Sequence, residues 1–177
     1  MMIACEEETS SEMTAGEMTS GEMTAGEMTN TEFSASEPYE RDVEFGWIAA
    51  GQPSEERLRA LVEMGARIIS LRAVSEEPFD EEALVNSLEG TFIRYPTSGS
   101  DYESVAFREA MYDLYDQQIE LGGPVYLHCA SSNRVGASWA LYHAERLNFS
   151  DEEALVIGQA AGLAGLESLV LSILEAN

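Results

Sequence analysis

The stretch that most constrains the fold of this chain runs from Val125 to Ala140, with the sequence VYLHCASSNRVGASWA. It opens with a short apolar run, 125–127, which follows the turn residues GGP and ends at polar residues, as is typical of a buried strand. The run after Arg134 is small and apolar on nearly every face, which is typical of a helix packed against a sheet. We therefore predict a buried strand, a six-residue loop and a buried helix.

The predicted loop has the features of an anion site. Where a strand passes through a loop into a helix, the loop N–H groups and the positive end of the helix dipole point at one place. Cys129 opens this loop and Arg134 closes it. Such surroundings favour the thiolate form of a cysteine, and arginine holds two phosphate oxygens at once better than lysine does. The pattern therefore predicts thiolate attack on phosphorus.

The segment HCASSNRVGA, 128–137, resembles the signature loop of the cysteine-dependent phosphatases. It is most similar to that of a bacterial phosphatase-like domain found alone or fused to beta-lactamase-like hydrolases. Three shorter segments extend the resemblance over most of residues 43–166: AGQPS at 50–54, IISLR at 68–72 and AAGL at 160–163. The resemblance implies hydrolysis of phosphate monoesters, with protein phosphotyrosine among the candidate substrates. It implies Cys129 as the nucleophile, Arg134 as the phosphate-binding arginine, and no cofactor.

Other residues near the loop receive supporting roles. We expect phosphate to be held by Arg134 together with the loop residues Ala130, Ser131, Ser132 and Asn133. His128 is expected to orient the loop, and Ser138 to supply the hydroxyl that usually follows the arginine directly. Arg72, at a strand end, is an ion-pair residue first and a phosphate ligand second. His143 is expected on a helix surface.

Two departures from the phosphatase pattern leave other functions open. Tyrosine and dual-specificity phosphatases generally place five residues between the cysteine and the arginine, whereas Cys129 and Arg134 enclose four. The usual loop glycine is also absent, with Ser132 in its place. The shorter loop resembles the persulfide loop of single-domain rhodaneses, so a sulfurtransferase with a persulfide on Cys129 is a second hypothesis. A catalytically weak anion-binding module is a third.

The rest of the globular sequence alternates predicted strands with predicted helices. Strands are expected at 43–49, as an outer strand, and at 67–71, 91–95 and 125–127; helices at 55–64, 80–88, 101–121, 135–142, 151–162 and 166–175. Ser54 and Ser150 are the predicted N-caps of two helices. This alternation favours an α/β domain over residues 41–177, with a mostly parallel sheet of four to five strands flanked by helices. Ligands bind beyond the carboxyl ends of such strands.

Asp101 is the candidate general acid. In cysteine phosphatases a loop at this topological place delivers an aspartic acid to the leaving-group oxygen, and Asp101 is the only carboxylic acid before the expected helix is under way. A structural explanation competes with this role. Ser100 and Glu103 have capping-box spacing, and the helix dipole alone favours an aspartate in the first turn. The sequence leaves both interpretations open.

Residues 1–40 differ in composition from the rest of the chain. They contain ten glutamates, no basic residue and a five-residue repeat, EMTAG with small variations, which predicts a disordered tail. The segment Ile3-Ala4-Cys5 resembles the end of a lipoprotein cleavage box, yet only four residues precede Cys5, fewer than a signal sequence needs. A lipid anchor at Cys5, and with it a location in the cell envelope, is expected only if the chain starts further upstream. Otherwise the expected location is cytoplasmic.

The net charge of the chain limits the classes of molecule that we expect it to bind. There are 33 acidic and 9 basic residues, all nine of them arginine, for a net charge of −24. Nucleic acids and anionic membrane surfaces are repelled by such a field and are not expected as partners. The resemblance to the phosphatases implies a phosphorylated small molecule or phosphoprotein as substrate. With two histidines and no cysteine pair, the sequence has no metal-ligand pattern.

Overall fold

The computed structural model describes residues 35–37 and 39–176. The chain divides into residues 1–30 and 31–177, and the description below concerns the second unit. Its centre is a five-stranded sheet in the order β1-β2-β5-β3-β4, in which only the β1–β2 pair is antiparallel. The strands are β1 (Glu40–Val43), β2 (Trp47–Ala50), β3 (Arg67–Ser70), β4 (Thr91–Arg94) and β5 (Val125–His128). The predicted tail, including Cys5, lies almost wholly outside the described residues.

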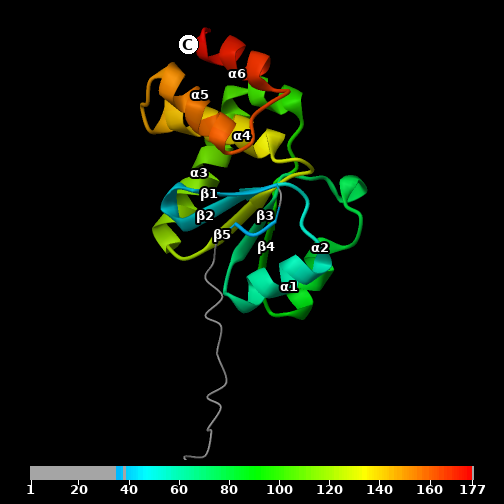
Figure 1. Ribbon diagram of the computed structural model, residues 1–177. Helices are drawn as coiled ribbons and strands as arrows, with labels where there is room; N and C mark the ends of the chain where they lie inside the picture. Colours follow the sequence, from blue (N-terminus) through cyan, green and yellow to red (C-terminus); the bar gives the residue numbers. More distant parts are fainter. Residues whose placement is uncertain (1–34, 38, 177) are drawn as a thin grey trace, which may run out of the picture. The chain divides into compact units, whose positions relative to one another are not determined.

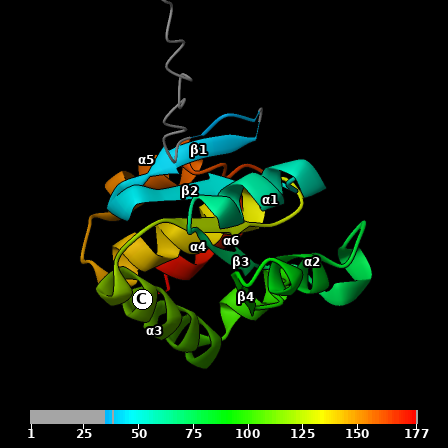
Figure 2. The ribbon, with the colours of Figure 1, turned by 90° about the horizontal axis from the view of Figure 1, so that it is seen from below.

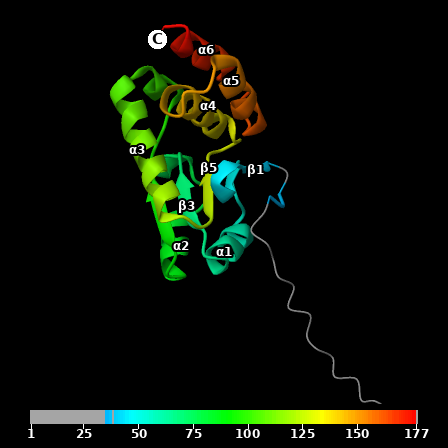
Figure 3. The same ribbon diagram turned by 90° about the vertical axis from the view of Figure 1, so that its left-hand side faces the viewer.

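Helices cover both faces of the sheet, as predicted for this fold class (Figures 1 and 3). One face carries α1 (Glu55–Glu63) and α2 (Glu81–Ser87); the other carries α3 (Val105–Leu121), α4 (Asn133–Leu141), α5 (Asp151–Ala160) and α6 (Glu167–Leu174). In the part of the chain that the structure describes, no helix is long and apolar enough to cross a bilayer.

The core consists of two layers because strand residues alternate between the faces of the sheet. Ile69 and Leu127 point into the larger layer, beneath α3 to α6. Their neighbours Ile68 and Tyr126 point into the smaller layer, beneath α1 and α2. The three central strands are therefore almost entirely buried, which explains their nearly continuous apolar sequence. Their carboxyl ends meet at one edge, where the Cys129 loop begins.

The predicted outer strand at 43–49 is wrong. The chain instead turns back at Glu44–Gly46 and forms a hairpin, so that β1 is the edge strand and β2 lies inside the sheet (Figure 2). Phe45 and Gly46 both adopt positive φ, 63° and 70°, which matches the twist of a hairpin turn. The apparent alternation across this segment concealed the turn.

The helix predicted at 101–121 begins later, at Val105. Residues Gly99–Glu103 form a 3₁₀ turn, and Ser104 caps α3. The capping box lies at Ser98 and Asp101, not at the predicted Ser100 and Glu103. The predicted caps Ser54 and Ser150 are confirmed, since each side chain accepts a hydrogen bond from the first turn of its helix.

Helices α4 and α5 pack unusually closely behind the loop. A Cβ built on Gly136 would lie 2.0 Å from the Leu163 nitrogen and 2.7 Å from the Gly158 oxygen, so the crossing requires glycine. After α4 the chain continues as a π-helical turn, Tyr142–Arg146. His143 in this turn is buried against Trp139 and Phe149, so its predicted surface position is wrong. The preceding helix α4 is apolar on nearly every side, so it has no polar face from which the position of His143 could be predicted.

Candidate active site

The signature segment forms the predicted strand, loop and helix, with a shorter loop than expected. β5 ends at His128 and α4 begins at Asn133, so Arg134 lies in the first turn of the helix and not in the loop. Gln52 donates its backbone N–H to the Ala130 oxygen at 3.2 Å, which ties the loop to the segment after β2. The first-turn N–H groups of α4 have no acceptor within the helix and are available to an anion.

Ser132 adopts the backbone conformation that the usual loop glycine would adopt. It adopts φ +65°, the left-handed region that favours glycine, and it occupies the N-cap position of α4. Its hydroxyl donates to the Ala161 oxygen at 2.7 Å and makes no capping hydrogen bond. The buried hydroxyl thus points away from the anion site, and the N–H groups of α4 remain uncapped by it.

Arg134 is held rigidly at the same edge of the sheet. Its Nη1 donates to the Leu71 oxygen at 3.1 Å and to the Thr97 oxygen at 2.9 Å. Both terminal nitrogens also contact the Glu76 carboxylate, at 3.1 and 2.9 Å. Burial lowers the pKa of Arg134, but Glu76 and Cys129 outweigh it, so the pKa lies above the ordinary value and the charge is permanent. Among the described residues, no protein oxygen accepts from Nε, and the Cys129 side chain interacts with the guanidinium.

Cys129 lies behind Arg134, in the core layer under α3 to α6. Its side chain is 1% exposed and belongs to the same cluster as Leu127 and Tyr102. The Tyr102 hydroxyl donates to the Arg134 backbone oxygen at 2.6 Å and braces the start of α4. The thiol is therefore placed at the base of the loop, next to the guanidinium.

Asp101 and Arg134 line one pocket of about 460 Å³, together with Ala73, Glu76, Pro96, Thr97, Ser98 and Gly99. Asp101 accepts hydrogen bonds from the backbone N–H and the hydroxyl of Ser98, both at 2.7 Å. These bonds lower the pKa of the Asp101 carboxyl. The Asp101 carboxylate therefore caps a turn and also lines the pocket, and its role as general acid stays a prediction.

The other predicted residues of the loop and of α4 differ in their exposure and in their hydrogen bonds. Ala130 and Ser131 are exposed on the loop, whereas Asn133 accepts from the backbone N–H of Ala164 at 2.8 Å and braces the link between α5 and α6. Ser138 is buried, donates to the Val135 oxygen and accepts from Tyr115, so its hydrogen is already committed. Ser138 therefore does not offer its proton to Cys129 in this arrangement.

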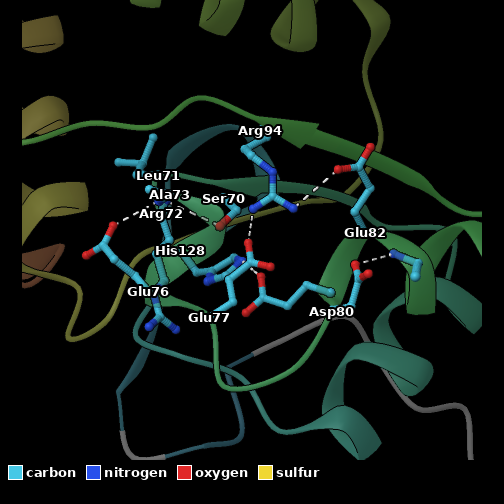
Figure 4. A network of polar contacts seen from close by, with 12 residues as sticks. Ser70, Leu71, Arg72, Ala73, Glu76, Glu77, Asp80, Glu82, Arg94 and His128 are labelled. Atoms are coloured by element: carbon cyan, nitrogen blue, oxygen red, sulfur yellow. Dashed lines mark hydrogen bonds and ion pairs between the residues drawn. The ribbon is translucent and has the colours of Figure 1, made fainter.

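His128 and Arg72 lie on the opposite side of the sheet from the Cys129 thiol, in a polar network with Glu76, Glu77 and Arg94 nearby (Figure 4). His128 Nε2 lies 3.2 Å from the Glu81 carboxylate. Arg72 is 7% exposed and makes no direct ion pair in the described part of the chain. Sequence reasoning missed Glu76 and Glu81, because nothing in the acidic stretch after Arg72 distinguishes these two glutamates from their neighbours.

Comparison with solved structures identifies the fold. Tk-PTP in its active form aligns with a TM-score of 0.63 at 16% identity, over 79% of this chain and 98% of that one. A DUF442 protein from Shewanella putrefaciens CN-32, described as a phosphatase, aligns with a TM-score of 0.59 at 19% identity, over 78% of this chain and 87% of that one. TpbA from P. aeruginosa, in complex with pTyr, aligns with a TM-score of 0.55 at 16% identity, over 76% of this chain and 95% of that one.

At these identities the likeness establishes the architecture, which is the cysteine-dependent phosphatase-like fold that the signature loop predicted. No family model and no curated protein matches the sequence.

Proposed function

We propose that this protein hydrolyses phosphate monoesters through a covalent cysteinyl-phosphate intermediate on Cys129. The observation that carries the proposal is that Arg134 lines one pocket with Asp101 and interacts with the buried Cys129 side chain. The fold of Tk-PTP and TpbA supports phosphatase chemistry at this edge. The uncapped start of α4 supports it as well, since those N–H groups suit the equatorial oxygens of a phosphoryl group.

In the first step, the Cys129 thiolate attacks phosphorus and a sulfur–phosphorus bond forms. The bond from phosphorus to the ester oxygen breaks, and protonated Asp101 gives its proton to that oxygen, which leaves as an alcohol or phenol. Arg134 and the α4 amides hold the non-bridging oxygens and stabilise their charge in the transition state.

In the second step, water attacks the cysteinyl phosphate and Asp101, now ionised, accepts a proton from it. The sulfur–phosphorus bond breaks, the Cys129 thiolate is restored, and inorganic phosphate is released. Glu76 and Asp101 place two carboxylates on the pocket wall, which disfavours substrates that carry several phosphates. We therefore expect a substrate with a single phosphate group, such as a phosphotyrosyl protein or a phosphorylated small molecule.

The decisive experiment measures hydrolysis of an aryl phosphate by the full chain and three variants. Cys129→Ser should reduce turnover to background, and Arg134→Ala should lower kcat about 100- to 1,000-fold. Asp101→Asn should cost about 100-fold or more on an alkyl phosphate, and less on an aryl phosphate whose phenolate leaves readily. Cys5→Ser, Arg59→Ala and Asp113→Asn are the matched controls and should keep wild-type activity.

The four-residue spacing between Cys129 and Arg134 also suits a persulfide loop, so sulfur transfer from thiosulfate to cyanide should be measured in parallel. Sulfur transfer that needs Cys129 but not Asp101, without phosphate release, would overturn the phosphatase proposal. Phosphate binding with neither activity would assign the domain to anion binding.

A further inference from the structure

A cluster of polar side chains, three of them buried and Gln52 half-buried, lies next to the Cys129 loop, on the side of the sheet covered by α1 and α2. It consists of Gln52, Arg72, Glu81 and His128. In the described residues, seven buried side-chain nitrogen and oxygen atoms make no hydrogen bond of good geometry, and six of them belong to these four side chains. Two of the six, Glu81 Oε2 and His128 Nε2, lie 3.2 Å from each other. Native proteins pair nearly all such atoms, so a concentration of exceptions at one place requires an explanation. Its position suggests that the cluster serves the loop.

Glu81 connects this cluster to the residue before the nucleophile. It lies at the start of α2, where its neighbours face solvent, yet its own side chain is 0% exposed. Its Oε2 lies 3.2 Å from His128 Nε2, and His128 is also fully buried. Burial raises the pKa of Glu81, but His128, Gln52 and Arg72 outweigh that effect and the pKa lies below its ordinary value. The buried group is therefore a carboxylate.

Gln52 connects the same carboxylate to the residue after the nucleophile. Its side-chain Nε2 donates to Glu81 Oε1 at 2.5 Å, and its backbone N–H donates to the Ala130 oxygen at 3.2 Å. Glu81 thus reaches the loop on both sides of Cys129, through His128 on one side and through Gln52 and Ala130 on the other. Arg72, whose Nε and Nη1 are buried nearby, balances the carboxylate charge electrostatically.

We propose that Glu81 is a positioning residue for the phosphatase reaction, which fixes His128 and the Ala130 backbone and so holds the Cys129 loop in its anion-binding conformation. This inference rests on the proposed function of the loop. Glu81 touches neither the pocket nor the thiol, so its effect is exerted through the loop. A small displacement of a reacting group from its productive geometry is sufficient to slow an enzyme strongly.

The test compares Glu81→Gln with Glu82→Gln, in a Cys5→Ser background so that Cys129 is the only thiol. Glu82 is the next residue of the same helix, half-exposed and paired with Arg94, and its variant should stay within about 2-fold of wild type. Glu81→Gln should lower kcat about 10- to 100-fold with little change in KM. Glu81→Asp, which keeps the charge, should lose less than Glu81→Gln, and Gln52→Ala should cause an intermediate loss. Rates are expressed per alkylatable Cys129, so that unfolded protein does not contribute.

A second measurement does not depend on turnover. Inorganic phosphate should protect Cys129 from iodoacetamide, and Glu81→Gln should need about 10-fold more phosphate for the same protection, because its loop binds the anion less well. A Glu81→Gln protein with a lower Tm but unchanged kcat per site and unchanged protection would overturn the proposal and leave Glu81 a purely structural residue. Should Glu81→Gln fail to fold, Glu81→Asp and Gln52→Ala decide by the same two measurements.

The outcomes also separate the two proposals. If wild type hydrolyses no phosphate ester but phosphate protects Cys129 less well in Glu81→Gln, the hydrolase assignment fails and the positioning role stands. If phosphate protects neither protein, both proposals fail.

Discussion

In the proposed reaction, the Arg134 guanidinium divides its donors between the protein and the phosphoryl group. Glu76, Leu71 and Thr97 take hydrogen bonds from its terminal nitrogens and fix its plane. In the described residues no protein oxygen accepts from Nε. A planar, five-donor group can hold both sets of partners at once, which a single ammonium cannot do.

Arg134→Lys should therefore behave almost as badly as Arg134→Ala. The lysine would keep the positive charge but lose the second oxygen contact and most of the anchoring bonds, and kcat should fall about 100-fold. Steady-state kinetics on an aryl phosphate measure this, with Arg59→Lys on the exposed side of α1 as the control. Near-normal activity of Arg134→Lys would show that charge alone, without geometry, is what the site needs.

Ser98 should set the pH range in which Asp101 works as an acid. Its backbone N–H and hydroxyl both lower the pKa of Asp101, and only the protonated carboxyl can donate to a leaving group. Ser98→Ala removes the hydroxyl bond, so the pKa of Asp101 should rise. The descending limb of kcat against pH, measured on an alkyl phosphate, should then move to higher pH.

Ser100→Ala is the control for that shift, because Ser100 contacts the Ser98 hydroxyl but makes no bond to Asp101 in the described structure. An unmoved limb in Ser98→Ala would mean that another group, and not Asp101, protonates the leaving oxygen.

At the scale of elements, the crossing of α4 and α5 positions the loop from behind. Gly136→Ala would drive a methyl group into the Leu163 backbone, and neither helix can move without shifting Ser132 and its bond to Ala161. We expect a loss of about 3 kcal/mol or more in the free energy of unfolding, at the upper end of overpacking effects. Urea denaturation measures it. Gly165→Ala, whose new methyl would meet only the Asn133 side chain at 3.6 Å, should change stability by less than about 0.5 kcal/mol.

The edge strand β1 is fastened to α1 by a buried ion pair. Arg57 contacts both oxygens of Glu40 at 2.8 and 2.9 Å. Burial raises the pKa of Glu40, but bonds from Arg57 and from the Ser36 and Glu37 backbones outweigh it, so the folded pKa lies below the ordinary value of 4.5. The stabilisation is therefore present above that ordinary pKa and is lost as the pH falls through the folded one.

Glu40→Gln should cost about 3 kcal/mol at neutral pH, because it breaks a buried ion pair by removing the charge of one member. The difference from wild type should shrink as the pH falls through the folded pKa of Glu40, which lies below the ordinary value of 4.5. Urea unfolding of both proteins at neutral and at acidic pH tests whether this difference in the free energy of unfolding decreases as expected. A difference that stays constant with pH would show that packing, and not charge, accounts for the loss.

At the scale of the whole molecule, the charge of −24 opposes the compact state. The exposed face of α3 shows this locally, where Arg146 is surrounded by Glu109, Asp113 and Asp116. At physiological ionic strength, salt largely screens the repulsion between exposed charges that lie more than about 8–10 Å apart. We expect the Tm to rise as sodium chloride increases from a low-salt buffer. Asp113→Asn should show a smaller salt effect, and a Tm that falls with salt would show that ion pairs outweigh the net repulsion.

The sequence by itself determined the features that depend on residues a few positions apart. The apolar run of β5, the small polar loop and the buried start of α4 follow from local composition, as do the serine caps of α1 and α5. The alternation of such units was sufficient for the α/β class and for the meeting of strand ends at the Cys129 loop. The hairpin at Glu44–Gly46 escaped prediction because its turn residues are atypical.

The tertiary structure alone decided which distant residues serve the loop. Glu76 meets Arg134 across 58 positions of sequence, and Glu81 at the start of α2 meets His128 at the end of β5. These contacts depend on the register of parallel strands and on the rotation of α2, and no local pattern in an acidic stretch encodes either. The same holds for Ser132, whose backbone is left-handed and whose hydroxyl donates a hydrogen bond to the Ala161 oxygen at the end of α5. Local signals select the elements, whereas burial and charge pairing between elements select the residues that complete the site.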